Sequence, residues 1–482
     1  MPSAAELEQD AGERRSLVNF GGNREWDARL YRPRDEQEVL DILAQRRSER
    51  VRAIGSLHSW SDIAVGSGLT LDMSRFDEVQ PVTANGETFV RAGAGGTLQH
   101  LLDRLHAATD RTLPTLGAIK RQTVSGAIST GTHGSGKPSL SHFVTAVRLA
   151  AYDATGKPRV LEYRGGDELK AARCSLGCMG VILSVELATV PKYRVAETVR
   201  RFGRVEDALR LYRDHPLTQF ALVPYGWKII AWERHAAPAA ADGGGWLRAR
   251  FARVFNLVGV DVLAHLFLKA SIVLGSSAVK ALLKALPYLL LTNVPRVDDA
   301  EHVLTMRHDL FRHEEMELFV PESAVVEAAA LSRSAIGIFA GDAASVPAAL
   351  EGKLRAAGLY DALIAGRGSY VHHYPMLFRR VLPEDALISM ASSSAEPWFS
   401  FSLFTYAAPA NRKPFYGLCS WFARAMFSLF GARLHWGKHY PLGAAETARM
   451  YPGLETFKRI RRTTDPAGVF RNAFSDRVLG SE

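Results

Sequence analysis

The sequence predicts an α+β protein with two domains, a glycine-rich first domain over residues 19–191 and a larger mixed domain over residues 192–482. Short β-branched runs alternate with helical patterns up to about Pro191, and the pattern changes beyond it. The chain is 47% hydrophobic and 23% charged, with a mean hydropathy of −0.04. This composition is typical of globular proteins and excludes a disordered, fibrous or polytopic membrane protein.

The first domain begins with an amphipathic helix over residues 35–46, for which Asp35 is the expected N-cap. A short strand over residues 51–54 follows and ends at Gly55. Later residues predict strands over 69–73, 88–92 and 144–152 and a helix over 98–108.

In the second domain, Gly243 to Gly245 predict a flexible joint before a markedly apolar, helical segment over residues 246–291. From about Val303 the sequence mixes strands and helices, and a compact segment over 452–480 follows.

The formal net charge is +9 and the sequence pI is about 9.4, but the basic residues are scattered along the chain. A nucleic acid is therefore not an expected partner. Three cysteines, Cys174, Cys178 and Cys419, are too few for a disulfide framework and lack a histidine cluster, so we expect buried core thiols and no metal site. The acidic N-terminal residues lack the features of a secretory signal, which favours a cytoplasmic location.

The first stretch with a chemical pattern is RAIGSLHSWSD, from Arg52 to Asp62. After Gly55, small and hydroxyl residues surround one histidine, His58. Such a loop lets backbone N–H groups approach a phosphate closely, because glycine and serine obstruct little. A simple turn with a hydrogen-bonded histidine is the alternative for this stretch alone.

The second stretch, LGAIKRQTVSGAISTGTHGSG, runs from Leu116 to Gly136 and is rich in glycine and hydroxyl residues. It has neither the spacing of a Rossmann loop nor that of a P-loop. Its composition suits backbone that wraps closely around a large, planar, phosphorylated ligand. An irregular loop without a ligand is the alternative.

The third stretch is LHWGKHY, from Leu434 to Tyr440, and it places Lys438 beside His435 and Trp436. A lysine among aromatic side chains can act on a substrate hydroxyl as a proton acceptor or hydrogen-bond donor. A surface lysine with a partly covered stem is the alternative.

In order and spacing, the three stretches together resemble the vanillyl-alcohol-oxidase (PCMH) type of FAD protein, and within it the sugar-1,4-lactone oxidases and alditol oxidases. Members carry G-x-x-H-S, T-V-G-G-A-x-x-T-G-T-H-G-T-G and H-W-[AG]-K motifs. Further family-like segments here are GCMGVI at 177–182, EMELFVP at 315–321 and DPAGVFRNAFSDRVLG at 465–480. The resemblance, which includes L-gulono- and D-arabinono-lactone oxidases, spans about residues 19–480.

The resemblance implies a PCMH-type FAD-binding domain over residues 19–191, a substrate-binding cap domain over 192–482, and FAD as the cofactor. His58 matches the position where many relatives bond covalently to the flavin 8α-methyl group. The residues implied to hold FAD are Ala53, Ile54, Gly55, Ser56, Leu57, His58, Ser59, Gly117, Ala118, Thr123, Gly126, Thr130, Gly131, Thr132, His133, Val181 and Ile182.

For catalysis, Lys438 matches the lysine that lies over the flavin near N5 and holds the reacting hydroxyl. Arg379 and Glu317 are expected to orient that hydroxyl and to balance flavin charge, and His435 belongs to the same late motif. The implied reaction moves a hydride from a CH–OH group to flavin N5, after which O2 or another acceptor reoxidises the flavin.

Two departures from the family pattern concern the substrate. Ala118 stands where relatives carry a serine, and Leu377 stands where they carry a glutamate two residues before the arginine matched by Arg379. We expect Trp398, Phe399 and Phe401 to add a hydrophobic wall. Since unpaired substrate hydroxyls are costly, a sugar with an alkyl, prenyl or lipid-linked substituent is a better candidate than a small free polyol.

The apolar segment 246–291 is interrupted by charged residues, so no uncharged run reaches the roughly 18 residues needed to span a bilayer. Interrupted basic, apolar helices can lie in a membrane interface, and residues 415–431 form a second such segment. Ordinary buried helices are the alternative for both. The sequence leaves the oligomeric state undetermined.

The leading hypothesis is an FAD-dependent oxidase or dehydrogenase that acts on a small alcohol or lactone, or on a hydrophobically substituted or lipid-linked sugar. One alternative is a flavin-binding protein with a degenerate active site. Another is a flavin-dependent C=C reductase, although no second dinucleotide motif supports it.

Overall fold

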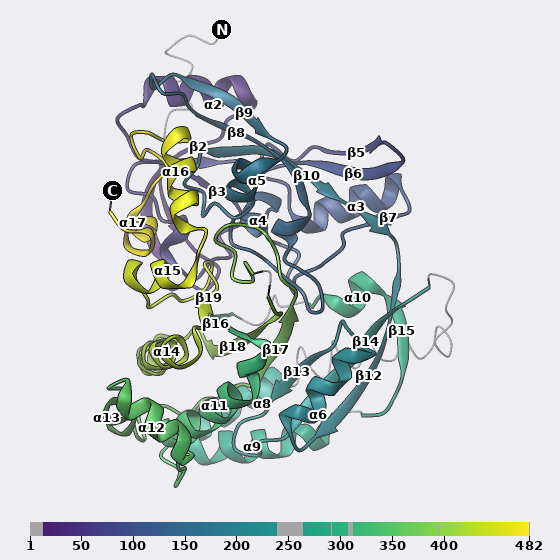
Figure 1. Ribbon diagram of the computed structural model, residues 1–482, viewed down its shortest axis with the longest axis vertical. Helices are drawn as coiled ribbons and strands as arrows, with labels where there is room; N and C mark the ends of the chain where they lie inside the picture. Colours follow the sequence, from purple (N-terminus) through teal and green to yellow (C-terminus); the bar gives the residue numbers. More distant parts are fainter. Residues whose placement is uncertain (1–12, 239–263, 291, 307–311, 394, 482) are drawn as a thin grey trace.

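The computed structural model describes residues 13–238, 264–290, 292–306, 312–393 and 395–481. Its strands form an upper group of sheets and one large lower sheet, with helices packed on both (Figure 1). This arrangement confirms the predicted α+β class, in which one glycine-rich domain precedes a mixed second domain.

The upper group contains a mixed four-stranded sheet, an antiparallel five-stranded sheet and a two-stranded ribbon. The four-stranded sheet consists of β1 (Glu13–Val18), β2 (Glu25–Tyr31), β4 (Leu69–Asp72) and β3 (Val51–Ile54). The five-stranded sheet consists of β5 (Val79–Ala84), β6 (Glu87–Gly93), β10 (Val181–Ala188), β8 (Val144–Tyr152) and β9 (Pro158–Tyr163). The ribbon pairs β11 (Val190–Pro191) with β7 (Arg111–Thr112).

Helices α2 (Glu36–Gln45), α3 (Leu98–Ala108), α4 (Val124–Ser129) and α5 (Gly166–Arg173) belong to this group. The expected cap is present, because the Asp35 side chain accepts a hydrogen bond from the backbone N–H of Glu38 at 2.9 Å. The predicted strands and helices of this region all form, within a few residues of their expected bounds.

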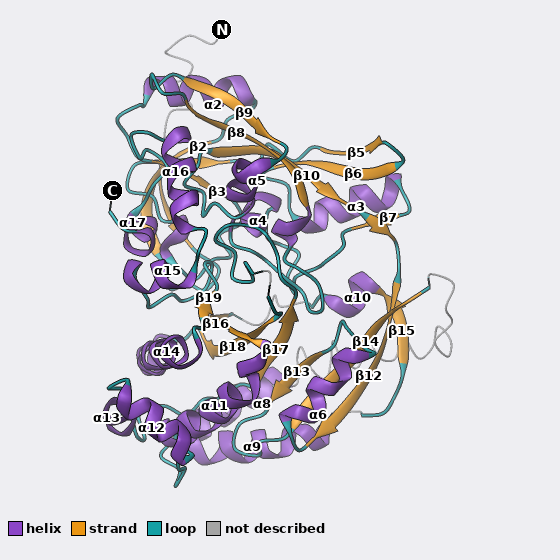
Figure 2. Ribbon diagram, in the orientation of Figure 1, coloured by secondary structure: helices purple, strands orange, loops and turns teal. Residues whose placement is uncertain are grey.

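The lower sheet is antiparallel and has eight strands in the order β15-β12-β14-β13-β17-β18-β16-β19. Its strands are β15 (Arg296–Asp299), β12 (Arg194–Phe202), β14 (Ile229–Ala237), β13 (Gln219–Leu222), β17 (Met376–Val381), β18 (Trp398–Tyr406), β16 (His313–Pro321) and β19 (Arg433–Leu434). Loops of the upper group, teal in Figure 2, reach one face of this sheet, where Ser135 Oγ donates to the backbone of Thr218 and Gly136 N to Arg380 O.

Helices surround the lower sheet. They are α6 (Val205–Arg210), α8 (Ala264–Leu274), α9 (Ser276–Leu289), α10 (Ala300–Leu304), α11 (Val325–Phe339), α12 (Ala348–Ala356), α13 (Tyr360–Ala365) and α14 (Pro409–Phe430). Within residues 415–431, the large side chains of Phe415, Trp421 and Phe422 are buried. The second apolar segment is therefore a core helix, and the membrane alternative for it is wrong.

The last helices return to the upper group (Figure 1, yellow): α15 (Ala444–Met450), α16 (Leu454–Thr464) and α17 (Ala473–Leu479). Helix α16 packs on α5, and the backbone N–H of Val51 in β3 donates to Val469 O at 2.9 Å. The buried guanidinium of Arg52 donates to the carbonyls of Leu176 and Gly177. The single domain boundary near residue 191 stays a prediction, and the sequence did not anticipate this return of the chain.

Candidate active site

Strand β16 presents two carboxylates to the upper group of sheets. Glu315 and Glu317 are two residues apart, so their side chains share one face of the strand. The segment after β19 is fixed beside them, because the backbone N–H groups of His435 and His439 donate to the carbonyls of Glu317 and Glu315, both at 2.9 Å. The sequence motifs EMEL and HWGK therefore meet along one strand edge.

Lys438 and Glu315 form an ion pair in which both side chains are buried. The ammonium group also lies 4.1 Å from the centre of the Trp60 ring, a distance that allows a cation–π interaction. Although burial alone would raise it, the pKa of Glu315 falls to about 2 because Lys438 stabilises the carboxylate. Lys438 Nζ donates to a carboxylate oxygen of Glu315, so the lysine is arranged as a hydrogen-bond donor.

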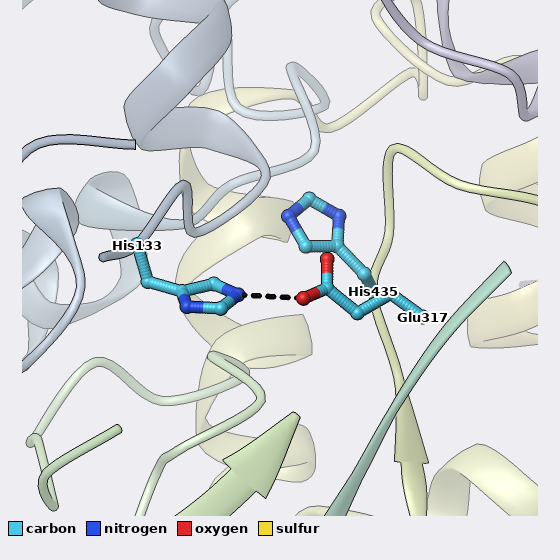
Figure 3. Close-up of side chains that lie close together, drawn as sticks. All are labelled: His133, Glu317 and His435. Atoms are coloured by element: carbon cyan, nitrogen blue, oxygen red, sulfur yellow. Dashed lines mark hydrogen bonds and ion pairs between the residues drawn. The ribbon is translucent and has the colours of Figure 1, made fainter. Parts of the chain in front are cut away.

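Glu317, His133 and His435 form a second buried cluster, in which one ligand atom from each residue lies within 4.8 Å of the others. Figure 3 shows the Glu317 carboxylate facing His133, with the ring of His435 beside it. His133 Nε2 lies 3.1 Å from Glu317 Oε1, and His133 Nδ1 lies 2.9 Å from the carbonyl oxygen of Gly134. Since that carbonyl only accepts, Nδ1 carries a proton, and a further proton lies between Nε2 and Oε1.

Burial lowers the pKa of His435 to about 3, so its imidazole is neutral near pH 7. Its Nδ1 accepts the backbone N–H of Gly437 at 3.1 Å, which leaves the proton on Nε2. The pKa of Glu317 lies well below its usual value: burial opposes this shift, but the adjacent His133 outweighs burial. The cluster therefore holds the ionised carboxylate of Glu317 beside the neutral imidazole of His435.

A polar row continues across the same face of the sheet. Ser402 on β18 lies directly opposite Glu317 on β16 and Leu377 on β17, and Ser400 lies opposite Arg379. Both serine hydroxyls are fully buried and have no hydrogen-bond partner among the residues that the structure describes. Buried hydroxyl groups are normally paired, so a ligand that supplies donors or acceptors fits here.

The expected aromatic wall is only partly correct. Phe399 and Phe401 alternate with the serines on β18, and their rings join those of Phe220 and Phe378. These four rings therefore pack on the opposite face of the sheet, away from Arg379. The period of two along a strand could have shown this from the sequence.

The loop after β3 contacts both the N-terminal and the C-terminal parts of the site. His58 stacks on Phe20 at 4.8 Å between ring centres, and the backbone N–H of Trp60 donates to Gly437 O at 2.8 Å. Leu57 has φ +54°, a left-handed conformation that favours glycine.

The other predicted cofactor residues lie in two regions. Gly117, Ala118, Gly131 and Thr132 are in loops that meet, because a Cβ on Gly117 would lie 2.6 Å from Thr132 Cγ2. Val181 and Ile182 begin β10, where they pair with Ala150 and Leu149 in the upper five-stranded sheet. Ala53 and Ile54 end β3, and Thr123 caps α4 with Thr130 at its other end.

Sequence reasoning missed several residues of the site. Glu315 was not an expected site residue, although its alternation with Glu317 predicts a shared face. Ser400 and Ser402 carry no motif, because their place depends on strand pairing between distant segments. Trp60 lies within the first stretch, but its contact with Lys438 depends on the meeting of that loop with the HWGK segment.

Comparisons with known proteins agree with this geometry. Residues 185–478 match the family described as D-arabinono-1,4-lactone oxidase, and residues 28–161 match the FAD binding domain. The first match covers more than half of the chain. The chain belongs to the D-arabinono-1,4-lactone oxidase family. It is an FAD-dependent oxidoreductase.

Two relatives of this D-arabinono-1,4-lactone oxidase family member span nearly the whole chain. A long-chain alcohol oxidase of an uncultured marine euryarchaeote is 38% identical and is matched over 96% of this chain and 97% of its own. An L-gulono-1,4-lactone dehydrogenase of Mycobacterium tuberculosis is 27% identical over 94% of this chain and 96% of its own. Among solved structures, a cholesterol oxidase from Brevibacterium sterolicum covers 99% of both chains with a TM-score of 0.71 at 14% identity, which shows a shared fold.

The residues of this family member fit FAD. A Cβ on Gly55 would lie 2.1 Å from Thr123 Oγ1, so only glycine lets the two loops approach this closely. The unpaired hydroxyls of Ser400 and Ser402 and the charged Lys438 face the region between these loops and the sheet. Hydrogen-bond donors and acceptors are therefore available where a flavin and an alcohol would meet.

Proposed function

We propose that the protein oxidises the CH–OH group of an alcohol that carries a large apolar substituent, such as a long-chain alcohol or a sugar with an alkyl or prenyl chain. The single observation behind this substrate class is an apolar path from the active face to an exposed helix. The similarity to the relative named long-chain alcohol oxidase adds support.

The path follows alternate residues of β18. Phe404 and Tyr406 share the face of Ser402 and lie opposite Glu315 and His313. The side chain of Tyr406 packs with Leu268 of α8, and Phe404 packs against the same cluster. Leu377, which replaces the family's glutamate, lies directly opposite Ser402. An apolar substituent leaving the carbinol would therefore meet aromatic and aliphatic side chains toward α8.

Bound FAD supplies the acceptor for the hydride that leaves the carbinol carbon. In the proposed roles, Lys438 donates a hydrogen bond to the carbinol oxygen, and its charge stabilises negative charge that develops there. Glu317, held by His133, and Arg379 orient the substrate and balance flavin charge. His58 is the proposed covalent attachment site of the cofactor, and the remaining loop residues named above hold it.

We further propose that α8 and α9 contact a membrane surface, with the protein otherwise in the cytoplasm. Six of the eleven exposed large apolar side chains in the described part of the chain lie on these two helices: Leu266, Phe267, Val273, Leu274, Tyr288 and Leu289. Exposed Lys269 and Lys284 accompany them. No helix within the described ranges is long and apolar enough to cross a membrane, and residues 246–263 and 291 of the predicted segment lie outside those ranges. An apolar patch with basic neighbours is typical of interfacial docking.

The test is anaerobic mixing of the purified, FAD-loaded protein with alcohols, with bleaching of the flavin absorbance as the readout. We expect 1-dodecanol or an alkyl-substituted sugar to reduce the flavin with a higher second-order rate constant than xylitol or L-gulono-1,4-lactone. Preference for the small lactone would overturn the apolar-substrate proposal. Absence of reduction by every alcohol would favour a degenerate site. Reoxidation with O2, compared with an artificial dye, then identifies the acceptor.

A further inference from the structure

A pocket opens beside the active face, between the loops around Leu116 and Ser135 and strands β13, β14 and β17. Leu116, Ala118 and Ser135 line it from the loops. From the sheet side, Gln219, Arg234 and Arg379 line it. Arg379 lines the pocket and also lies opposite Ser400 in the polar row described above. The pocket therefore adjoins the place proposed for the reacting alcohol.

The floor of the pocket is part of a row of charges in register across the sheet. Arg296 on β15 lies opposite Glu197 on β12, which lies opposite Arg234 on β14. Glu197 Oε2 accepts from Arg234 Nε at 2.6 Å and Oε1 accepts from Arg296 Nε at 2.7 Å, so one carboxylate serves two buried arginines. Arg379 lies opposite Gln219 on β13, and Gln219 lies opposite Trp232, two residues before Arg234 on the same face of β14. Arg379 is therefore offset by two residues from that row, and the four charged side chains comprise three arginines and a single carboxylate.

Two cations line the pocket without forming an ion pair. Within the described ranges, the side chains of Arg379 and Lys137 form no hydrogen bond or ion pair, and Glu317 acts on Arg379 only through a longer-range Coulomb attraction. No Asp or Glu is among the described residues that line the pocket. Burial lowers the pKa of Arg234, and repulsion from Arg296 and Arg379 lowers it further against the attraction of Glu197. The pocket thus contains excess positive charge that an anion would neutralise.

The neighbouring groups are hydrogen-bond donors suited to oxygen atoms. Tyr193 lines the pocket, and burial raises its pKa to about 12, so its hydroxyl keeps its proton and can donate. The amide of Gln219 adds another donor on the same face as Arg379. Planar guanidinium groups beside such donors match a carboxylate or phosphate.

We propose that this pocket binds an oxyanion, a carboxylate or phosphate, at the end of the active face opposite the apolar path. The oxyanion is either a group on the alcohol substrate, a few bonds from the carbinol, or a separate anion bound beside a neutral alcohol. The assignment of the oxyanion to the substrate rests on the proposed function. The binding of an oxyanion by the pocket does not.

Calorimetric titration of the FAD-loaded protein with inorganic phosphate, at constant ionic strength set with chloride, tests the binding. Wild type is expected to bind phosphate, and Lys137→Gln to bind it about tenfold more weakly, the effect of losing one charge-assisted hydrogen bond. Gln219→Glu places a carboxylate opposite Arg379 and should abolish binding. Lys157→Gln, at an equally unpaired lysine in a distant turn, is the matched control and should bind like wild type.

The source of the oxyanion follows from steady-state kinetics with 3-hydroxydodecanoate and its methyl ester. If the anion belongs to the substrate, the acid has a kcat/KM at least tenfold above that of the ester, phosphate competes with it, and Gln219→Glu removes the difference. If the anion is separate, phosphate lowers KM for the ester in wild type and not in Gln219→Glu. The inference would be overturned if wild type did not bind phosphate, or if it bound phosphate only without FAD. Equal binding by wild type, Lys137→Gln, Gln219→Glu and Lys157→Gln would overturn it as well. Phosphate binding without flavin reduction by any alcohol would instead overturn the proposed function.

Discussion

Lys438 and Glu315 form a buried ion pair between the late HWGK segment and strand β16. Removing one partner of such a pair leaves an uncompensated buried charge, so the two residues act as a unit. The ammonium group is held over Trp60 by this pair, close to the loop that contains His58. The position of the Lys438 ammonium group therefore depends on Glu315 as well.

Lys438→Met is expected to keep FAD but to slow flavin reduction by on the order of 10²-fold, the usual scale for a lost acid/base or positioning group. Stopped-flow absorbance with a saturating alcohol measures this rate. Lys458→Met is the matched control, because Lys458 forms an ion pair with Glu455 on α16. The flavin of this variant should be reduced at the wild-type rate. A Lys438→Met protein as fast as wild type would remove Lys438 from the mechanism.

His58→Ala is expected to release all FAD into the supernatant after acid precipitation, whereas wild type keeps the yellow colour in the pellet. The reason is the place of His58 in the loop after β3, stacked on Phe20. Absorbance of pellet and supernatant at the flavin maximum gives the bound fraction. Release of FAD from wild type as well would show that the cofactor is not covalently attached.

Leu377→Glu combined with Ala118→Ser is expected to shift preference from alkyl-substituted alcohols toward xylitol and small lactones. Burial of ~100 Å² of apolar surface at about 25 cal/mol per Å² favours the substituted substrate by roughly 2.5 kcal/mol, or about 70-fold. Comparison of kcat/KM for both substrate sets in both proteins measures the shift. A double mutant that gains nothing on the polyols would contradict the role given to Leu377.

Glu384 predicts a pH-dependent stability. Its carboxylate accepts from Ser139 N and Oγ, and burial raises its pKa from 4.5 to about 7. A raised carboxyl pKa contributes stability that is complete below about pH 4.5 and is lost as pH rises to about 7. The loss is on the order of 3 kcal/mol at about 1.4 kcal/mol per pKa unit.

Glu384→Gln should flatten this dependence, measured as urea midpoints at pH 5 and pH 8. Glu396→Gln is the control, because the only partly buried Glu396 likewise accepts from the N–H and hydroxyl of one serine, Ser323. Its dependence on pH should follow wild type. Equal slopes for all three proteins would argue against a buried, protonated Glu384.

Phe267→Ser with Val273→Ser is expected to reduce sedimentation with anionic phospholipid vesicles at least tenfold, because both side chains are exposed on α8. Val326→Ser, on α11, changes an exposed valine elsewhere and is the control. Activity on a soluble short-chain alcohol should be unchanged in all proteins. Vesicle binding that survives the double change would place the contact elsewhere.

The sequence was sufficient to predict the fold class, the early elements and the two motifs that meet at the site. Local signals did this: Asp35 before a helical pattern, Gly55 at a strand end, and histidine and lysine at family spacing. It was insufficient for the polar row, because Ser402 meets Glu317 only through pairing of β18 with β16. The charged pocket was missed for the same reason, since Arg234 and Arg379 come from strands about 145 residues apart in sequence numbering.

The return of the C-terminal segment sets an order of assembly during synthesis. Arg50, just before β3, and Arg52, within it, donate to the carbonyls of Gly468 and Phe470, each 418 residues later in the chain. The loop that follows β3 is likewise closed by Gly437 through Trp60. A nascent chain that has completed the whole FAD binding domain still lacks these partners while it remains on the ribosome. The contacts that close the loop after β3 therefore form only after residues 437–470 have emerged.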